Sequence, residues 1–396
     1  MMTRLRIPRL LAAYTVLLAG AAVAAPYVPT SDAAVLEHLP FRSGGNAERM
    51  ARAMQTLLAR DTNNLDIALR LAQLDVDRAR IESDPRQLGH AQATLAPWWK
   101  EAEPPVPVVL LRATILQSTH QFGPARADLE QVVRRQPGNA QAWLTLATVQ
   151  QVTGDLDGAR ASCVHVSAVS TTALGSICTA SLDGVTGHAA DALASIDQLL
   201  VRPAAFGDSI RVRTWATTLA GELAERLGRR TVAGQDYRSS LALDPKDAYT
   251  IATYADFLLD EGRPADVVSL IPLDTPVDVL LLRRAQADRA LGSDDAPKSR
   301  QELIDRFAAL RARGDRVHLR EEARFTLAIL DQPAAALDLA LANWAVQKEP
   351  LDARIALECA IAAQRPQAVD DVVRSISSTG LEGARIAALT AQAQTR

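Results

Sequence analysis

The residues that could carry catalysis or bind a metal are few in this sequence and widely spaced. The six histidines are at positions 38, 90, 120, 165, 188 and 318. They do not form a metal-binding pair, and the sequence holds neither a phosphate-binding glycine loop nor a Gly-x-Ser-x-Gly nucleophile motif. His318 precedes Glu321 and Glu322, which indicates either half a metal site or a solvated helix start where the dipole favours acids. We therefore predict no catalytic residues, no metal site and no cofactor.

The stretch from Thr214 to Asp247 predicts the elements that must position any functional side chain. Leucines recur there at helical spacing up to a break at Gly228. A second apolar run follows and stops at Pro245, because proline lacks an N–H and clashes with the preceding turn. The stretch is therefore expected to form two helices joined by a tight turn. Of the whole chain 48% is hydrophobic but only 4% aromatic, which favours close-packed helices over sheets.

The 34-residue unit resembles a tetratricopeptide repeat. That family has small residues at the eighth and twentieth positions, an aromatic near the twenty-fourth and proline near the thirty-second. Here these are Gly221, Ala233, Tyr237 and Pro245. Further units carry small or apolar residues at the matching pairs of positions, which are Ala113 and Ala125, Ala147 and Ala159, Ala180 and Ala192, and Ala255 and Val267. The resemblance implies an all-α fold, a right-handed α-α superhelix of stacked helix pairs. The alternative is an irregular helical bundle.

The resemblance also bears on the cysteines. Cys163 falls on the second helix of one unit and Cys178 on the first helix of the next. These two helices are neighbours in a tetratricopeptide-like stack, so the resemblance implies a disulfide between them in an oxidising compartment. The alternative is two buried thiols. Cys359 has no partner nearby in sequence and is expected to be buried.

The first 24 residues have the pattern of a secretory signal peptide. Three arginines precede an apolar run of about 13 residues, from Leu10 to Ala22, which is too short to cross a bilayer. The small residues Ala22-Val23-Ala24 offer a cleavage site; an uncleaved anchor is the alternative. Cleavage would change the net charge from −3 to −6. An acidic chain has no electrostatic reason to bind nucleic acid. We expect an exported protein, in a bacterial periplasm, without membrane insertion after cleavage.

Five segments are predicted along the chain. They are a signal peptide at 1–24, a proline- and glycine-containing linker at 25–45, divergent helical repeats at 46–105, well-formed repeats at 106–274, and divergent repeats with a terminal cap at 275–396. About seven extra residues interrupt the array near Pro203.

The family positions that face the concave side predict a partner-binding groove. In the repeat that begins at Thr214 and in the repeat after it, the resemblance assigns to that groove Trp215, Thr218, Glu222, Glu225, Tyr249, Asp256 and Asp260. Aromatic residues are common in binding hot spots, and carboxylates attract a segment that carries Lys or Arg. The alternative is that the acids only keep the solenoid soluble and are neutralised by Arg226, Arg229 and Arg230.

Two classes of function are consistent with this sequence. The resemblance implies a non-catalytic scaffold that binds a protein or peptide along its concave face, in the assembly or maintenance of the cell envelope. The alternative is an enzyme or small-molecule receptor that uses the groove as its site. A defined pocket with converging perturbed acids would favour this alternative, and a long open groove would favour the scaffold.

Overall fold

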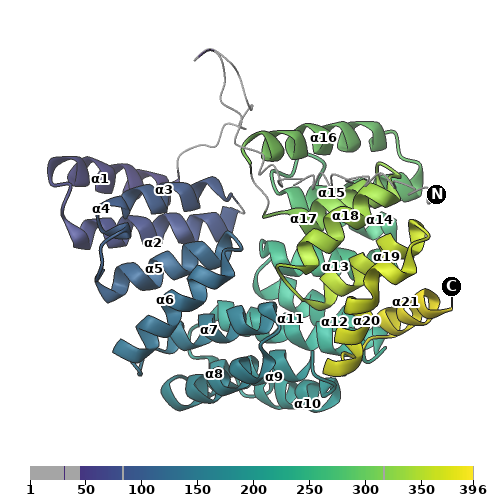
Figure 1. Ribbon diagram of the computed structural model, residues 1–396, viewed down its shortest axis with the longest axis horizontal. Coiled ribbons are helices and arrows are strands. Elements are labelled where there is room, and N and C mark those ends of the chain that lie inside the picture. Colours follow the sequence, from purple (N-terminus) through teal and green to yellow (C-terminus); the bar gives the residue numbers. More distant parts are fainter. Residues whose placement is uncertain (1–30, 32–44, 83, 315–316, 396) are drawn as a thin grey trace, which may run out of the picture.

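The computed structural model describes residues 31, 45–82, 84–314 and 317–395, which fold as a continuous array of helices (Figure 1). No β-strand occurs in these residues. The predicted signal peptide lies outside the described residues, and so does nearly all of the predicted linker. Helices that follow one another in sequence pack side by side, which confirms the all-α solenoid of stacked helix pairs.

The helices of the first half of the array lie between positions 46 and 206. They are α1 (Asn46–Arg60), α2 (Leu65–Glu82), α3 (Arg86–Thr94), α4 (Ala96–Trp99), α5 (Val106–Ser118), α6 (Phe122–Arg135), α7 (Ala140–Thr153), α8 (Leu156–Val169), α9 (Thr172–Asp183), α10 (Ala189–Leu200) and the 3-10 helix η1 (Pro203–Phe206).

The second half continues the array in the same manner. Its helices are α11 (Ile210–Arg226), α12 (Arg230–Leu243), α13 (Ala248–Asp260), α14 (Pro264–Leu270), α15 (Asp278–Leu291), α16 (Ala296–Ala312), α17 (Leu319–Ala328), α18 (Pro333–Trp344), α19 (Pro350–Ala362), the 3-10 helix η2 (Pro366–Val369), α20 (Asp370–Thr379) and α21 (Ala384–Gln394).

Short polar side chains begin several of these helices by accepting a hydrogen bond from the first turn. Asn139 caps α7 in this way, Asp155 caps α8 and Asp247 caps α13. α7 ends at Gly154, whose φ of 85° is the left-handed conformation that favours glycine. The sequence therefore specifies the tight turns that pair the helices.

Small residues let the paired helices approach closely, as the repeat pattern predicts. Ala147, Ala159, Ala233 and Ala255 are all buried. At Gly221 an added Cβ would lie 2.8 Å from Cε1 of Tyr237, a side chain of α12 that is fully buried. Close packing of α11 on α12 thus depends on a residue without a side chain.

The insertion near Pro203 forms η1 and joins the largest apolar cluster. Phe206 is buried there, and Trp215 of α11 packs against the same cluster. None of the helices in the described part of the chain combines the length and the apolar character that crossing a bilayer requires.

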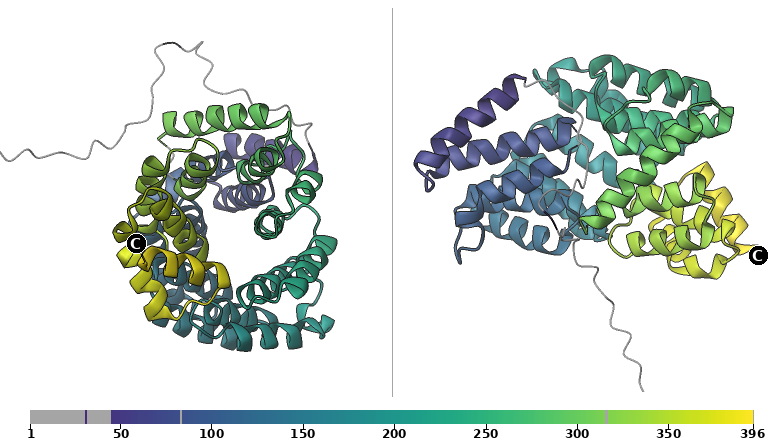
Figure 2. Two further views of the ribbon diagram at one scale, coloured as in Figure 1. Left: turned by 90° about the vertical axis from the view of Figure 1, so that its right-hand side faces the viewer. Right: turned by 90° about the horizontal axis from the view of Figure 1, so that it is seen from above.

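The array curves until its end returns to its middle. Viewed along the axis of the curve, the helices form a ring, with α11 and α13 on one side and α17, α18 and α19 opposite (Figure 2). The backbone N–H of Lys348, between α18 and α19, donates to the carbonyl of Val152 in α7 at 2.8 Å. The first helices of successive pairs therefore face one another across the concave side.

Candidate functional site

The concave face of α11 and α13 holds the residues that the sequence assigns to a groove, but Thr218 is not accessible there. Thr218 is 1% exposed, and its hydroxyl lies 2.7 Å from both Ser240 Oγ of α12 and Thr250 Oγ1 of α13. The prediction that Thr218 contacts a partner is therefore wrong. Its position faces the junction of three helices, where a small hydroxyl satisfies two neighbouring hydroxyls in the interior.

Glu222 and Glu225 lie one turn apart on α11, and each accepts a hydrogen bond from a tyrosine. Tyr249 of α13 donates to Glu222, and Tyr237 of α12 donates to Glu225 at 2.7 Å. Neither carboxylate forms an ion pair with another described residue. Tyr249 is 60% exposed, so its ring is available to a partner while its hydroxyl is held. Trp215, near the start of α11, is half-buried.

The pKa of both glutamates is raised, and burial is the largest cause. Burial raises the pKa of Glu225 to about 7, and the neighbouring charges of Asp260 and Glu222 act in the same direction, against the hydrogen bond from Tyr237 and the charge of Arg354. Burial also raises the pKa of Glu222, opposed by Arg226 and by the hydrogen bond from Tyr249. A cation placed beside these carboxylates would favour their charged form.

Asp256 and Asp260 on α13 are in a different situation, because arginines of the chain itself neutralise them. Asp256 pairs with Arg283 of α15 at 2.8 Å and with Arg324 of α17 at 2.6 Å. Burial opposes its ionisation, yet the two guanidinium groups hold the pKa of Asp256 far below its usual range. Asp260 forms two hydrogen bonds with Arg354 of α19, at 2.6 and 2.7 Å. Of the four acids predicted for the strip, only the two on α11 form no ion pair with a described residue.

These arginines were not among the cations that the sequence suggested. Arg226 donates to the carbonyl of Gly184, and Arg230 pairs with Glu261 outside the strip. Arg354 lies 94 residues from Asp260 in sequence. No local pattern indicates such a pair; only the curvature of the array brings α13 and α19 together.

No family model matches the sequence, and no curated protein matches it. Among solved structures the chain is similar to PilW, a widely conserved type IV pilus biogenesis factor, at 19% identity and a TM-score of 0.41, over 51% of this chain and 94% of PilW. It is similar to the Cut9-Hcn1 hetero-tetramer of APC/C at 10% identity and a TM-score of 0.49, over 88% of this chain and 67% of the other. It is also similar to a tetratricopeptide repeat protein of Parabacteroides merdae, at 16% identity and a TM-score of 0.30, over 73% of this chain and 98% of the other.

The fold is a tetratricopeptide-like solenoid. At the identities above, the likeness to solved structures concerns the fold alone. The architecture is evident in this chain itself, from its stacked helix pairs and from the small residues where the pairs approach.

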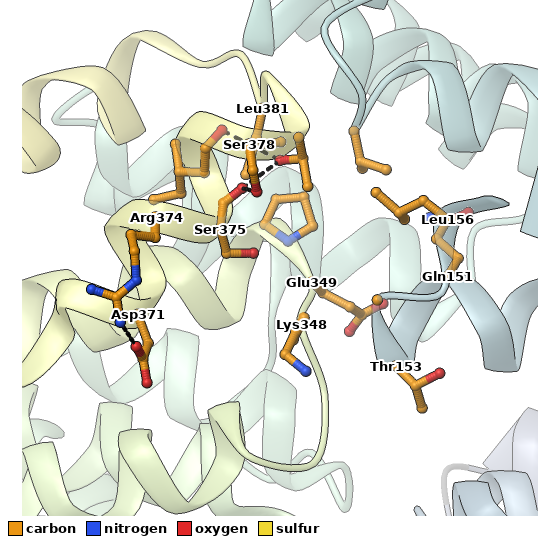
Figure 3. Close-up of a pocket in the computed structure, with 15 residues that line it drawn as sticks. Gln151, Thr153, Leu156, Lys348, Glu349, Asp371, Arg374, Ser375, Ser378 and Leu381 are labelled. Atoms are coloured by element: carbon orange, nitrogen blue, oxygen red, sulfur yellow. Dashed lines mark hydrogen bonds and ion pairs between the residues drawn. The ribbon is translucent and has the colours of Figure 1, made fainter.

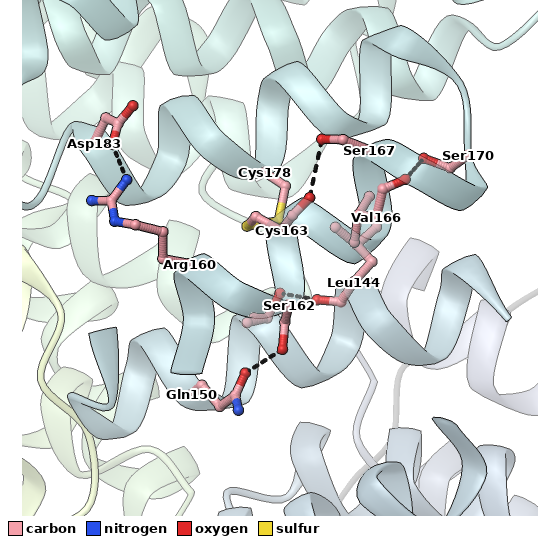
Figure 4. The surroundings of a disulfide bond; sticks show 11 residues. Leu144, Gln150, Arg160, Ser162, Cys163, Val166, Ser167, Ser170, Cys178 and Asp183 are labelled. Atoms are coloured by element: carbon pink, nitrogen blue, oxygen red, sulfur yellow. Dashed lines mark hydrogen bonds and ion pairs between the residues drawn. A yellow bond between two sulfur atoms is a disulfide. The ribbon is translucent and has the colours of Figure 1, made fainter. Parts of the chain in front are cut away.

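The predicted disulfide between Cys163 and Cys178 is present in the solenoid (Figure 4). It joins α8 to α9, with the two Cα atoms 5.5 Å apart, and both cysteines are buried. Cys359 is buried as expected, and burial raises the pKa of its thiol to about 12. The disulfide therefore ties one helix pair of the solenoid to the next.

A pocket of about 430 Å³ lies between α7–α8 and the C-terminal helices (Figure 3). Lys348, Glu349, Asp371 and Arg374 line it together with the hydroxyls of α20. The glutamates with a raised pKa are not among its lining residues. Within the described residues no group of three His, Cys, Asp or Glu side chains is arranged to hold a metal ion. Pocket and perturbed acids thus do not converge on one site.

Proposed function

We propose that this protein is an exported, non-catalytic scaffold that binds a protein or peptide partner along the concave face of its solenoid. The observation that carries the proposal is the pair Glu222 and Glu225, two desolvated carboxylates that accept hydrogen bonds from tyrosine hydroxyls and form no ion pair with a described residue. A Lys or Arg side chain of a partner would supply the missing charge. The exposed ring of Tyr249 would give that partner apolar contact at low entropic cost.

Export is part of the proposal and rests on two independent features. The N-terminal 24 residues have the composition of a signal peptide. The Cys163–Cys178 disulfide is a bond that persists in oxidising compartments such as the bacterial periplasm. We place the partner among proteins that assemble or maintain the cell envelope, and not among nucleic acids, because the chain is acidic overall.

Affinity capture from the envelope fraction tests the proposal. The mature protein serves as bait beside the double variant Glu222→Lys and Glu225→Lys, which reverses the charge of the pair. Glu101→Lys is the matched control, since Glu101 is exposed and lies far from α11 in sequence. We expect the double variant to lose partners that wild type and control retain. If folded double variant retains every partner, the α11 strip is not the binding surface.

A small-molecule receptor is the second candidate, favoured by the pocket of about 430 Å³, which is within the size range of ligand sites. A screen of envelope metabolites by thermal shift would detect such a ligand. The receptor function predicts that Arg374→Ala abolishes the shift while the charge reversal on α11 leaves it unchanged.

A further inference from the structure

The ring of helices closes along one line, which we call the seam. One side of the seam consists of the last turn of α7, with Val152, and the start of α10, with Gly187 and Ala189. The other side consists of Lys348, just before α19, and of Gly380 and Glu382 between α20 and α21. Besides the Lys348–Val152 hydrogen bond, a carboxylate oxygen of Glu382 accepts from the backbone N–H of Ala189 at 3.0 Å. Each of the two bonds joins residues at least 193 positions apart in sequence, so the seam joins distant parts of the chain.

Polar contacts hold the seam, and apolar packing does not. Each of the seven buried apolar clusters of the described residues lies wholly to one side of it. Everywhere else along the array, neighbouring helix pairs share such a cluster. Burial of apolar surface is the main stabilising contribution to a permanent interface, whereas a single hydrogen bond contributes only about 1 kcal/mol net. The seam is therefore the weakest junction of the ring.

The packing at the seam is also incomplete. The pocket of about 430 Å³ lies along it, with Gln151, Gly154 and Leu156 from one side and Lys348, Ser375 and Leu381 from the other. Side chains of the two sides therefore do not fill the space between them here. The backbones also approach closely at Gly187 and Gly380, where a Cβ added at Gly187 would lie 3.1 Å from the carbonyl oxygen of Gly380, and the Lys348 side chain lies against Gly154.

We propose that the seam opens and closes while both halves of the solenoid stay folded, and that opening admits the partner to the concave face. The moving part is the C-terminal arm, α18 to α21, whose apolar cluster also includes Ala323 of α17. Phe325 of α17 and Ile329 at its end pack instead with α15 and α16, so the hinge of the arm lies at α17. The role of opening in partner entry rests on the proposed function, whereas the opening itself does not. α19 begins at the seam and carries Arg354, whose ion pair with Asp260 of α13 ties the arm across the concave face, so an opening wide enough to expose α11 must also break this pair.

Hydrogen exchange of the Lys348 amide measures opening without any partner. This amide is protected by the seam through Val152, whereas the amide of Leu357 is protected inside α19. We expect Lys348 to exchange at least about a hundredfold faster than Leu357, as a sub-global opening does. Equal rates at the two amides would mean that the seam opens only when the protein unfolds, and the proposal would be wrong.

A cross-link at another point of the seam separates a concerted opening from local motion of one turn. A Cβ added at Gly187 would lie 3.7 Å from the Cα of Gly380, and a Cβ added at Gly380 would lie 3.6 Å from the Cα of Gly187. The two Cα atoms are therefore no farther apart than a disulfide spans, so we choose Gly187→Cys with Gly380→Cys. Both glycines have a positive φ, and each single cysteine variant is the control for the backbone strain that the substitution adds. The cross-link should slow exchange at Lys348 by more than about tenfold relative to either single variant. Unchanged exchange at Lys348 would overturn the proposal.

Partner capture with the cross-linked variant tests the role of opening. We expect the cross-link to abolish capture and the single variants to retain it. If the cross-link slows exchange at Lys348 but capture persists, the gating role is wrong although the seam opens. Loss of capture in the α11 charge-reversal variant would still support the proposed function, so the two ideas fail separately.

Discussion

At the scale of single residues, Glu225 makes stability depend on pH in an unusual direction. Its pKa is raised from 4.5 to about 7 by burial, so between these values the folded protein keeps a proton that the unfolded chain releases. The free energy of unfolding therefore decreases as pH rises through that window. Paired acids such as Asp256, whose pKa is lowered, contribute the opposite dependence at lower pH.

Glu225→Gln tests this effect. Glutamine still accepts a hydrogen bond from Tyr237 but does not titrate. The free energy of unfolding of the variant, relative to wild type, should increase by about 1–3 kcal/mol from pH 5 to pH 8. Urea unfolding at both pH values measures this difference. Glu101→Gln, at an exposed position, should show no such gain. A gain that is the same at pH 5 and pH 8 would contradict the raised pKa.

Gly221 is the second residue whose environment gives a sharp prediction. Alanine normally stabilises a helix interior by up to about 1 kcal/mol relative to glycine. At Gly221 the added Cβ would lie 2.8 Å from the buried ring of Tyr237, so Gly221→Ala should destabilise by about 1–3 kcal/mol. Gly89→Ala in α3, where no atom lies within 4 Å of the new Cβ, should stabilise instead. Opposite signs of the two changes in urea midpoint are the expected result.

At the scale of elements, the disulfide joins two helix pairs that also share apolar packing. It closes a stretch of 15 residues, for which the chain-entropy account gives about 3 kcal/mol. Cys163→Ala with Cys178→Ala should lose about that amount, and reductant should then have no further effect on the unfolding midpoint. Cys359→Ala removes buried packing but leaves the response to reductant intact. A wild-type midpoint that reductant does not move would contradict the structural role of the bond.

The elements were predictable because their determinants are local. Small residues recur every 34 residues on either side of the insertion near Pro203, so Gly221, Ala233 and Pro245 mark helices that the structure contains within a few residues. The disulfide followed from the same register. Thr218 shows the limit of the repeat pattern as a predictor. Its family position faces the concave side, but here Ser240 and Thr250 enclose it. A one-dimensional pattern does not specify such a three-helix junction.

At the scale of the whole molecule, curvature determines which concave acids are available. Arg283 lies on the neighbouring first helix, 27 residues after Asp256, whereas Arg354 follows Asp260 by 94 residues and meets it only because the array curves. Glu222 and Glu225, at the α11 end of the strip, form no ion pair with a described residue. The same curvature brings the C-terminal arm to the seam. A sequence pattern gives each helix pair but not the sum of the small rotations between pairs, so neither the arginine network nor the seam was predictable.

The Asp256 network is where curvature and stability can be tested together. Asp256→Asn keeps the shape of the side chain but leaves Arg283, which is 3% exposed, and Arg324 without a carboxylate. Removing one partner of a buried ion pair typically costs about 3–5 kcal/mol, because the remaining charge stays desolvated. The two guanidinium groups would then repel each other and separate α15 from α17, so the radius of gyration from X-ray scattering should increase. Asp266→Asn is the matched control, since it removes an exposed pair with Arg263 that contributes at most about 1 kcal/mol. Equal losses in the two variants, or an unchanged radius in Asp256→Asn, would show that the network does not set the curvature of the solenoid.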